Sequence, residues 1–345
     1  MPSADRNVRP IGVGVVGVRP GPEAGLMDEL PQGDMFQLVG FSDEGLEGGW
    51  PEDRPGAFYS DYNMLLHDPK VELILVDGPV ELRRDFAVRA LNAGHHAVLR
   101  PPFGQAPADG ERIMKTALRQ GLVATVDMPL RDDPDLLALE EAIRQENVPA
   151  IHGALCFQRA PEPLPAEKAP LDLFGAPEDE EDSPEALRPD RRDVVLPGGA
   201  LARAGAGMLY QLRLLVREDV KSVSAHLERP RQGDPDNGFF LYLPLRGGGW
   251  AIVQAGQARA PGVPRWVLYA PQATFTAQDG TVTVVTGGQQ RTYTASGTPQ
   301  SFWQNLHAAV RHGADLKCHP VDVVRAMKMH EAAVASVELG EPVTL

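Results

Sequence analysis

The first 126 residues alternate between two kinds of segment, and this alternation restricts the fold more than any other feature of the chain. Short apolar runs rich in β-branched residues recur at positions 11–16, 37–41, 71–76, 96–99 and 122–126. Runs that are apolar on both faces are typical of strands buried in a parallel sheet. Helical segments lie between them. In the segment 81–93 the stripe is formed by Leu82, Phe86, Ala90 and Leu91, and Gly94 ends the helix. The alternation predicts a parallel sheet with helices on both faces.

The pattern changes after about residue 150, where strands separated by turns replace the alternation. Strands are predicted at 150–158, 220–228, 239–244, 250–255, 265–269, 281–286 and 290–294. A final helix is predicted over 320–339, with Val324, Met327, Val334 and Val337 on one face and Gly340 at its end. The fold class is therefore α/β. A Rossmann-like domain of residues 1–128 precedes an α+β domain of residues 129–345, which carries a large, mainly antiparallel sheet.

Composition excludes several classes of partner. The formal net charge of −14 argues against a nucleic-acid or anionic-membrane partner, because both require a basic surface. Only two cysteines occur, no set of side chains has metal-ligand spacing, and no secretory signal or membrane-spanning run is visible. We therefore expect a cytoplasmic protein without a metal. Residues 161–193 are rich in proline and acidic residues and are interpreted as a mobile acidic loop or, alternatively, a partner-binding arm.

A glycine motif marks a possible nucleotide site. Residues 12–17 spell Gly-Val-Gly-Val-Val-Gly, but the first two glycines lie inside the predicted strand, so the phosphate-binding turn begins at Gly17. Val18 follows, and Arg19 stands where a second glycine would let the backbone approach a pyrophosphate. The Arg19 side chain would either fill the phosphate space or bind the phosphate. Asp43, after the second strand, would either bind the adenosine ribose, which favours NAD over NADP, or cap a turn.

Several motifs occur in a characteristic order. Residues 59–103 contain Tyr-x-Asp-Tyr, Leu-Leu-x-Asp-Pro-x-Val, a strand followed by Pro79, and Ala-Leu-x-Ala-Gly-x-His; Gly-Gly-Ala-Leu follows at 198–201. In this order the motifs resemble the Gfo/Idh/MocA family of NAD(P)-dependent oxidoreductases. The resemblance implies a dinucleotide in the first domain and oxidation or reduction of a sugar or cyclitol over the sheet of the second. It places cofactor contacts at Gly17, Val18, Arg19, Asp43, Pro79 and Arg100.

The chain departs from the family at the positions that carry proton transfer. The family motif Glu-Lys-Pro falls on Arg100-Pro101-Pro102, and a proline at the lysine position can neither donate nor accept a proton. An Asp and a His that the family places four residues apart on one helix fall on Arg203 and Gly207. The Asn and His that follow the third strand's proline fall on Val80 and Arg83.

These departures lead to three functional hypotheses. The first is a catalytically degenerate relative, a pseudoenzyme that binds a nucleotide or small anion, with Arg100, Arg131 and Arg203 as ligand contacts. The alternative for Arg100 and Arg203 is that each pairs with a local carboxylate. The second is a divergent NAD(P)-dependent dehydrogenase or reductase acting on a sugar or polyol. The third is an interaction scaffold using the C-terminal sheet. In the family the open face of that sheet commonly forms a dimer interface. We expect a homo-oligomer, a dimer or dimer of dimers, because the sheet carries Phe239, Phe240, Trp250, Trp266 and Val267.

Overall fold

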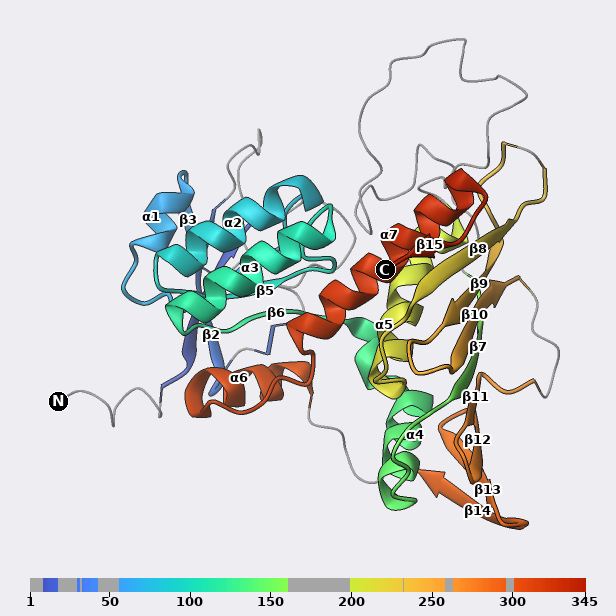
Figure 1. Cartoon of the computed structure of the whole chain (residues 1–345). Coiled ribbons are helices and arrows are strands. Elements are labelled where there is room, and N and C mark those ends of the chain that lie inside the picture. The colour runs from blue at the N-terminus through green and yellow to red at the C-terminus, as the bar shows by residue number, and fades with distance from the viewer. Residues whose placement is uncertain are drawn as a thin grey trace. The chain divides into compact units, whose positions relative to one another are not determined.

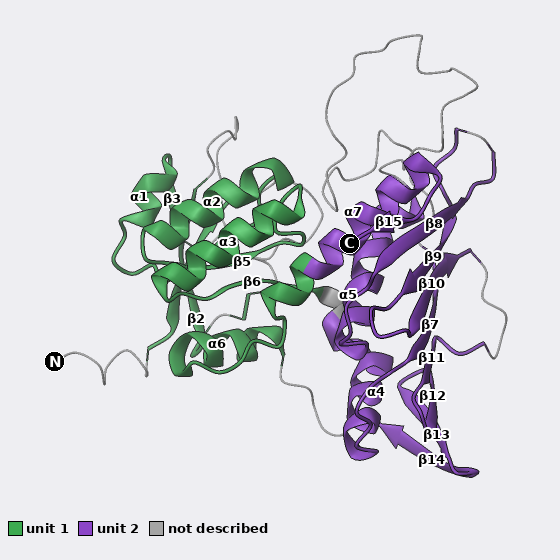
Figure 2. Cartoon of the chain, viewed as in Figure 1, with its two compact units in different colours: residues 1–128, 300–324 green, residues 129–299, 325–345 purple. Residues whose placement is uncertain are grey.

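The computed structural model divides the chain into two compact units (Figure 2). Unit 1 comprises residues 1–128 and 300–324, and unit 2 comprises residues 129–299 and 325–345. The described residues are 9–17, 30–31, 33–42, 56–160, 199–231, 233–257, 263–295 and 301–345. Val18, Arg19, Asp43 and the predicted acidic loop of residues 161–193 lie outside them.

Unit 1 is built on a six-stranded parallel sheet, as the alternation predicts. Its order is β3-β2-β1-β4-β5-β6. The strands are β1 (Ile11–Val16), β2 (Phe36–Ser42), β3 (Ala57–Tyr59), β4 (Leu73–Val76), β5 (His96–Leu99) and β6 (Ala124–Val126). The direction of winding reverses between β1 and β4. In doubly wound sheets this reversal opens a ligand crevice at the carboxyl ends of the two strands.

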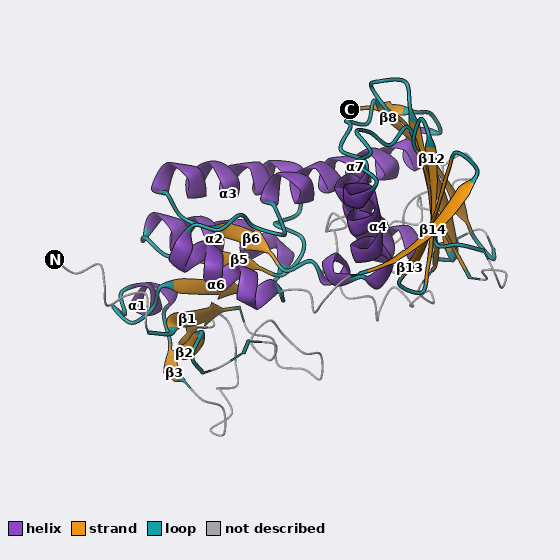
Figure 3. Cartoon of the chain, turned by 90° about the horizontal axis from the view of Figure 1, so that it is seen from below, coloured by secondary structure: helices purple, strands orange, loops and turns teal. Residues whose placement is uncertain are grey.

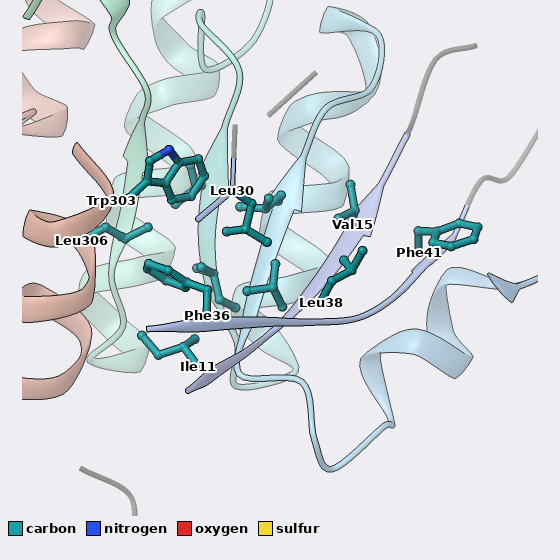
Figure 4. Packing of buried hydrophobic residues seen from close by; sticks show 12 residues of the cluster. Ile11, Val15, Leu30, Phe36, Leu38, Phe41, Trp303 and Leu306 are labelled. Carbon is teal, nitrogen blue, oxygen red and sulfur yellow. The ribbon is translucent and has the colours of Figure 1, made fainter. Parts of the chain in front are cut away.

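The two faces of β1 pack differently. On one face, Ile11, Val13 and Val15 point into a core that also holds Phe36, Trp303 and Leu306 (Figure 4). On the other face, a Cβ added to Gly12 would lie 1.7 Å from the Lys70 carbonyl oxygen, and one added to Gly14 would lie 2.9 Å from the Ile74 Cδ1 atom. The absence of a side chain at both glycines therefore lets Lys70 and Ile74 pack directly against the β1 backbone. The first two glycines of the formal motif are strand residues, as predicted.

Helices α1 (Tyr62–Leu66), α2 (Val80–Asn92) and α3 (Pro107–Gln120) belong to unit 1. The predicted apolar stripe of α2 is wrong at one position. Leu82 is 42% exposed, whereas Arg83 is fully buried beside Phe86, Ala87, Ala90 and Leu91. The helix is rotated relative to the prediction because Arg83 has buried carbonyl groups to bond.

A segment from the end of the chain completes unit 1. Helix α6 (Phe302–His312) begins at a capping box formed by Ser301 and Gln304, and sequence reasoning did not predict it. Trp303 meets Phe36 edge to face, with ring centroids 5.7 Å apart. Arg311 Nη1 lies 2.8 Å from Glu72 Oε2. Residues 300–324 thus cluster with the first sheet, although the predicted second domain included them.

Unit 2 carries a nine-stranded sheet of order β14-β13-β12-β11-β7-β10-β9-β8-β15. Its β7–β10 pair is parallel and its other described pairs are antiparallel. The strands are β7 (Gly153–Arg159), β8 (Ser222–Glu228), β9 (Gly238–Pro244), β10 (Trp250–Gly256), β11 (Trp266–Tyr269), β12 (Ala273–Gln278), β13 (Thr281–Thr286), β14 (Gln289–Thr294) and β15 (Val343–Thr344). The prediction of a large, mainly antiparallel sheet is confirmed.

Helices α4 (Pro134–Gln145), α5 (Ala206–Leu215) and α7 (Pro320–Leu339) lie on one side of this sheet (Figures 1 and 3). Of the five sheet side chains on which the expected oligomer rests, two point into the core. Phe239 and Trp266 are fully buried, whereas Phe240 and Tyr242 alternate with the buried residues of β9 and are exposed. Because side chains alternate along a strand, the buried residues point toward the helices and the exposed residues point to the open face.

Candidate functional site

The carboxyl edge of β1 and β4 forms the switch point of unit 1. Gly17 follows β1 with φ +79°, and a Cβ on it would lie 2.3 Å from the Gly78 Cα atom. The Gly17 amide donates to the Ser42 carbonyl at 3.2 Å, and the Asp77 amide donates to the Val16 carbonyl at 3.0 Å. The turns after β1 and β4 are therefore held in direct contact, and only glycine fits at position 17.

Arg100 lies at this edge and pairs with a carboxylate. Its Nε atom lies 2.7 Å from Asp77 Oδ1, and the two residues follow the adjacent strands β5 and β4. Asp77 is almost fully buried and Arg100 is one-quarter exposed. Of the two alternatives for Arg100, local pairing is therefore found. The pair carries no net charge, so the edge does not repel an anion as Asp77 alone would.

Arg83, where the resemblance places a histidine, is hydrogen-bonded to Pro101, where it places a lysine. Its Nη1 donates to the Pro101 carbonyl at 2.9 Å and to the Pro102 carbonyl at 3.4 Å. Its Nε donates to the Gly78 carbonyl at 2.9 Å. Pro79 lies between the strand end and α2 as the helix N-cap. One buried guanidinium thus joins the loop after β4 to the loop after β5.

The neighbouring positions are equally unsuited to proton transfer. Pro101 and Pro102 are joined by a cis peptide bond, and neither side chain has a titratable group. Val80, where the resemblance places an asparagine, is 1% exposed and apolar. Sequence reasoning found each of these positions separately. It missed the bonds among them, because no sequence pattern indicates that an arginine will bond to backbone carbonyls eighteen and nineteen residues later.

In unit 2, a second set of residues surrounds the glycine-rich helix start. The Leu201 amide donates to Asp236 Oδ2 at 2.8 Å, and the Ala200 amide donates to the Asp236 carbonyl at 2.9 Å. A Cβ on Gly199 would lie 1.8 Å from Asp236 Oδ1, so position 199 admits only glycine. Burial raises the pKa of the Asp236 carboxyl, and the hydrogen bond from Leu201 opposes this rise. Sequence reasoning missed Asp236, because Pro-Asp-Asn-Gly is typical of an ordinary turn.

The helix start is wound as a π-helix, η4 (Leu201–Gly205), which continues into α5. The ring Nε2 of His330, on α7, lies 3.1 Å from the Leu201 carbonyl oxygen. Burial lowers the pKa of His330 to about 4, so its ring is neutral at pH 7 and Nε2–H donates this bond. A Cβ on Gly205 would lie 3.1 Å from the His330 ring, so glycine leaves room for the histidine.

The remaining predicted ligand residues also belong to unit 2. Arg131 Nη1 lies 3.1 Å from Glu140 Oε2, so its guanidinium is engaged locally. Arg203 lies in η4 and is partly buried, and Gly207 in α5 offers no side chain where the resemblance places a histidine. The structure therefore brings together Arg83, Pro101 and Pro102, and it pairs Arg100 and Arg131 with carboxylates.

Among the residues that the structure describes, no three His, Cys, Asp or Glu side chains gather in a way that could hold a metal ion. Within the same described ranges, no helix combines the length and the apolar character needed to cross a bilayer.

Comparison with known proteins defines the class. Residues 11–128 match the oxidoreductase family with an NAD-binding Rossmann fold, Gfo/Idh/MocA. The N-terminal part of the chain therefore carries this family's NAD-binding Rossmann fold, which supports a nicotinamide dinucleotide as the cofactor class.

Individual relatives agree with this assignment. The chain is 24% identical to scyllo-inositol 2-dehydrogenase (NADP(+)) IolW of Bacillus subtilis over 153 residues. This aligned region covers 43% of this chain and 41% of the relative. It is 31% identical to the uncharacterized oxidoreductase YhhX of Escherichia coli over 86 residues, 25% of each protein. The chain thus spans less than half the length of the curated relatives that it matches.

Solved structures share the fold over almost the whole chain. An NAD-binding protein from Listeria innocua aligns with a TM-score of 0.70 at 21% identity, covering 97% of each chain. UDP-N-acetylglucosamine 3-dehydrogenase GnnA from Acidithiobacillus ferrooxidans aligns with a TM-score of 0.67 at 15% identity, covering 96% of this chain and 98% of that one.

The described residues fit a dinucleotide at the switch point. Gly17, at the end of β1, carries no side chain, and the Asp77–Arg100 pair keeps the adjacent edge neutral. Ser42, at the end of β2, is fully buried, and its hydroxyl has no hydrogen-bond partner among the described residues. A polar group of a ligand at this edge would find an available hydroxyl there.

Proposed function

We propose that this protein binds a nicotinamide dinucleotide, or a nucleotide-like anion, and does not perform the lysine-dependent chemistry of its family. The observation that carries the proposal is the Arg83–Pro101 hydrogen bond of 2.9 Å. It joins the positions of the family's histidine and lysine through a buried guanidinium and a backbone carbonyl. Neither group titrates near neutral pH, so neither can transfer a proton there.

The chain's own residues would then act as a binding frame. A bound nicotinamide dinucleotide supplies hydride transfer in this family. Gly17 would let backbone approach the dinucleotide, and the Arg100 guanidinium would balance the charge of Asp77 beneath the phosphates. Arg83 would hold the loops after β4 and β5 in a fixed arrangement. No group of this set moves a proton, which favours binding without turnover.

A divergent dehydrogenase is the second candidate. The names of two relatives favour it, since one is a scyllo-inositol dehydrogenase and another a UDP-N-acetylglucosamine dehydrogenase. In that case the substrate would be a sugar or polyol, and a proton-transfer group would have to come from positions outside the family motif. The two candidates share cofactor binding and differ in turnover.

The testing experiment separates binding from turnover. Purified protein is titrated calorimetrically with NAD, NADH, NADP and NADPH, then assayed by nicotinamide absorbance with scyllo-inositol and UDP-N-acetylglucosamine. We expect binding of at least one dinucleotide and no turnover. Cofactor-dependent oxidation of either substrate would refute the binding-only proposal, and failure of all four titrations would refute the dinucleotide.

A variant pair locates the site. Arg100→Ala leaves the buried Asp77 carboxylate uncompensated, and we expect dinucleotide affinity to fall roughly tenfold, the equivalent of one charge-assisted bond. Arg112→Ala removes an exposed arginine from α3 of the same unit and should leave affinity unchanged. Equal binding by wild type and Arg100→Ala would place the ligand elsewhere.

We also propose that the protein forms a homodimer through the open face of the unit 2 sheet. Tyr242, Ile252, Leu155 and Val267 occupy successive strands in register, forming one apolar row across the face opposite the helices. Phe240 and Tyr269 extend the exposed apolar surface. Large exposed apolar patches commonly mark association surfaces.

Because only two cysteines occur and both are buried thiols, we also propose a cytoplasmic location.

A further inference from the structure

Unit 2 contains a cavity of about 200 Å³ at the C-terminal end of α5. Its walls come from α5, the loop that follows it, the turn after β9, the middle of α7 and Leu345. All of these residues lie within unit 2. None belongs to the glycine-rich start of the helix or to the switch point of unit 1, so the cavity is independent of the proposed dinucleotide site.

The lining combines an apolar wall with a cationic rim. The apolar side chains are Leu212, Val216, Val220, Leu245, Met329 and Leu345. The cationic side chains are Arg213, Arg246, Arg325 and Lys328. Two carboxylates, Glu218 and Asp219, also line the cavity, so its side chains carry an excess of two positive charges. The chain as a whole has a formal charge of −14, which makes this cationic excess a local exception.

The two carboxylates neutralise the rim incompletely. Glu218 Oε1 accepts a hydrogen bond from the Gly247 amide. Asp219 Oδ1 lies 3.7 Å from Arg325 Nη2 and 3.9 Å from Arg213 Nη1, beyond hydrogen-bond distance from either. The Asp219 side chain is 55% exposed, so water screens these interactions. Two guanidinium groups therefore converge near one weakly engaged carboxylate.

Backbone groups hold two of the arginines in place. Arg213 Nη1 donates to the carbonyls of Val216 at 3.3 Å and Glu218 at 3.1 Å, and its side chain is only 10% exposed. Arg246 Nη2 donates to a main-chain oxygen of Leu345 at 2.6 Å. Because their orientation is fixed before a ligand arrives, these side chains would lose little conformational freedom on binding.

We propose that this cavity binds a small organic monocarboxylate with an apolar body. The carboxylate would meet the guanidinium rim and the body would contact the apolar wall. A cavity of about 150 Å³ accommodates benzene, so one of about 200 Å³ accommodates a ring or branched chain with a short acid group. The modest cationic excess and the apolar wall favour a singly charged amphipathic acid over a phosphate ester.

The ligand would bridge two helices. Leu212 and Val216 come from the end of α5, and Met329 comes from α7, one residue before His330. His330 bonds the Leu201 carbonyl in the π-helix at the start of the same α5 segment. Occupation of the cavity would therefore stabilise the α5–α7 packing, and binding should raise the unfolding temperature.

The test uses phenylacetate and its uncharged analogue phenylacetamide with the full-length protein. Binding is followed by ligand-observed NMR and by the shift in unfolding temperature. We expect phenylacetate to bind, and phenylacetamide to bind at least roughly tenfold more weakly because it lacks the charge-assisted bonds. Arg325→Gln should weaken phenylacetate roughly tenfold while leaving the far-ultraviolet circular dichroism unchanged, since Arg325 is 43% exposed.

Arg291→Gln is the matched control. Arg291 is 55% exposed, pairs with Glu146 and lies on β14, outside the cavity lining. Phenylacetate affinity should be unchanged in this variant. Arg246→Gln provides a second test of the rim and should also weaken binding. Absence of phenylacetate binding at millimolar concentration, equal binding of the amide, or equal affinity in Arg325→Gln and Arg246→Gln would each overturn the proposal.

Discussion

Arg83 is the residue that joins the loops after β4 and β5. A fully buried guanidinium is costly unless its donors are bonded, and here the backbone carbonyls of Gly78, Pro101 and Pro102 accept from its Nε and Nη1 atoms. These carbonyls in turn depend on Arg83 for their hydrogen bonds. The residue therefore stabilises the loops after β4 and β5 in a way that a titrating histidine would do only in its charged form.

Replacing this side chain should be expensive in stability. Arg83→Met keeps the length and removes the donors, and we expect the free energy of unfolding to fall by about 3 kcal/mol. Arg84→Met is the matched control on the same helix, because Arg84 is 41% exposed and pairs with Asp85 and Asp109 at the surface. Its cost should stay below about 1 kcal/mol. Urea unfolding measures both. Equal losses would mean that the buried bonds contribute little.

The glycines of β1 give a second residue-scale prediction. Gly12→Ala would place a Cβ 1.7 Å from the Lys70 carbonyl oxygen, a backbone atom that cannot move alone. We expect a loss of about 2 kcal/mol or more. Gly256→Ala, at the end of β10, meets no atom closer than 3.9 Å and should be nearly neutral. Thermal unfolding compares the two, and a neutral Gly12→Ala would contradict the packing role.

At the scale of elements, the start of α5 is fixed from two directions. Asp236 bonds the amides that open the helix, and His330 of α7 bonds the Leu201 carbonyl. Both partners come from positions far along the chain. The π-helix between them leaves backbone groups that an ordinary helix would pair internally. This local geometry follows from tertiary contacts, so the Gly-Gly-Ala-Leu motif predicted a helix start but not its form.

The buried His330 gives a pH-dependent prediction. Its folded-state pKa of about 4 lies below the usual 6.5, so the unfolded state takes up the proton first as pH falls. Stability is therefore lost as pH falls below about 6.5. His330→Gln keeps a side-chain donor for Leu201 and removes the titration. Between pH 7 and pH 5, wild type should lose about 2 kcal/mol more than this variant.

Chemical denaturation at several pH values checks the prediction. His226→Gln, on the exposed side of β8, is the control and should follow the wild-type pH profile. His96 keeps part of the pH dependence in every variant, because burial lowers its pKa to about 4 as well. Identical pH profiles for wild type and His330→Gln would show that His330 titrates normally.

Sequence patterns predicted the elements that are apolar on both faces and missed those that depend on distant partners. β1 and β5 were predicted at their observed bounds because their apolar runs are continuous. β12 was missed because its alternate residues are threonines. α6 was missed, and its place in unit 1 rests on Trp303 meeting a strand almost 270 residues earlier in the chain. Likewise, the resemblance located Arg83, Arg100 and Pro101, but their bonds arise only when loops meet.

At the scale of the whole molecule, the open sheet face governs the predicted assembly. Tyr242→Glu places a charge in the apolar row, and we expect the dimer to dissociate to monomers, because a buried unpaired charge is costly. Leu118→Glu makes the same chemical change at a side chain on α3 that is 84% exposed, and should leave the dimer intact. Light scattering coupled to size-exclusion chromatography measures the mass. A monomeric wild type would contradict the proposed interface.

The discontinuity of unit 1 has a consequence for biosynthesis. Residues 300–324 belong to unit 1 but follow the sequence of most of unit 2. At roughly 5–20 residues per second, a ribosome needs roughly ten to thirty seconds to pass from residue 128 to residue 300. During this interval the sheet face that carries Ile11 and Phe36 lacks its cover from Trp303 and Leu306. We therefore expect chaperones to bind the exposed apolar face of the nascent first unit. A premature stop anywhere before α6 would leave both units incomplete.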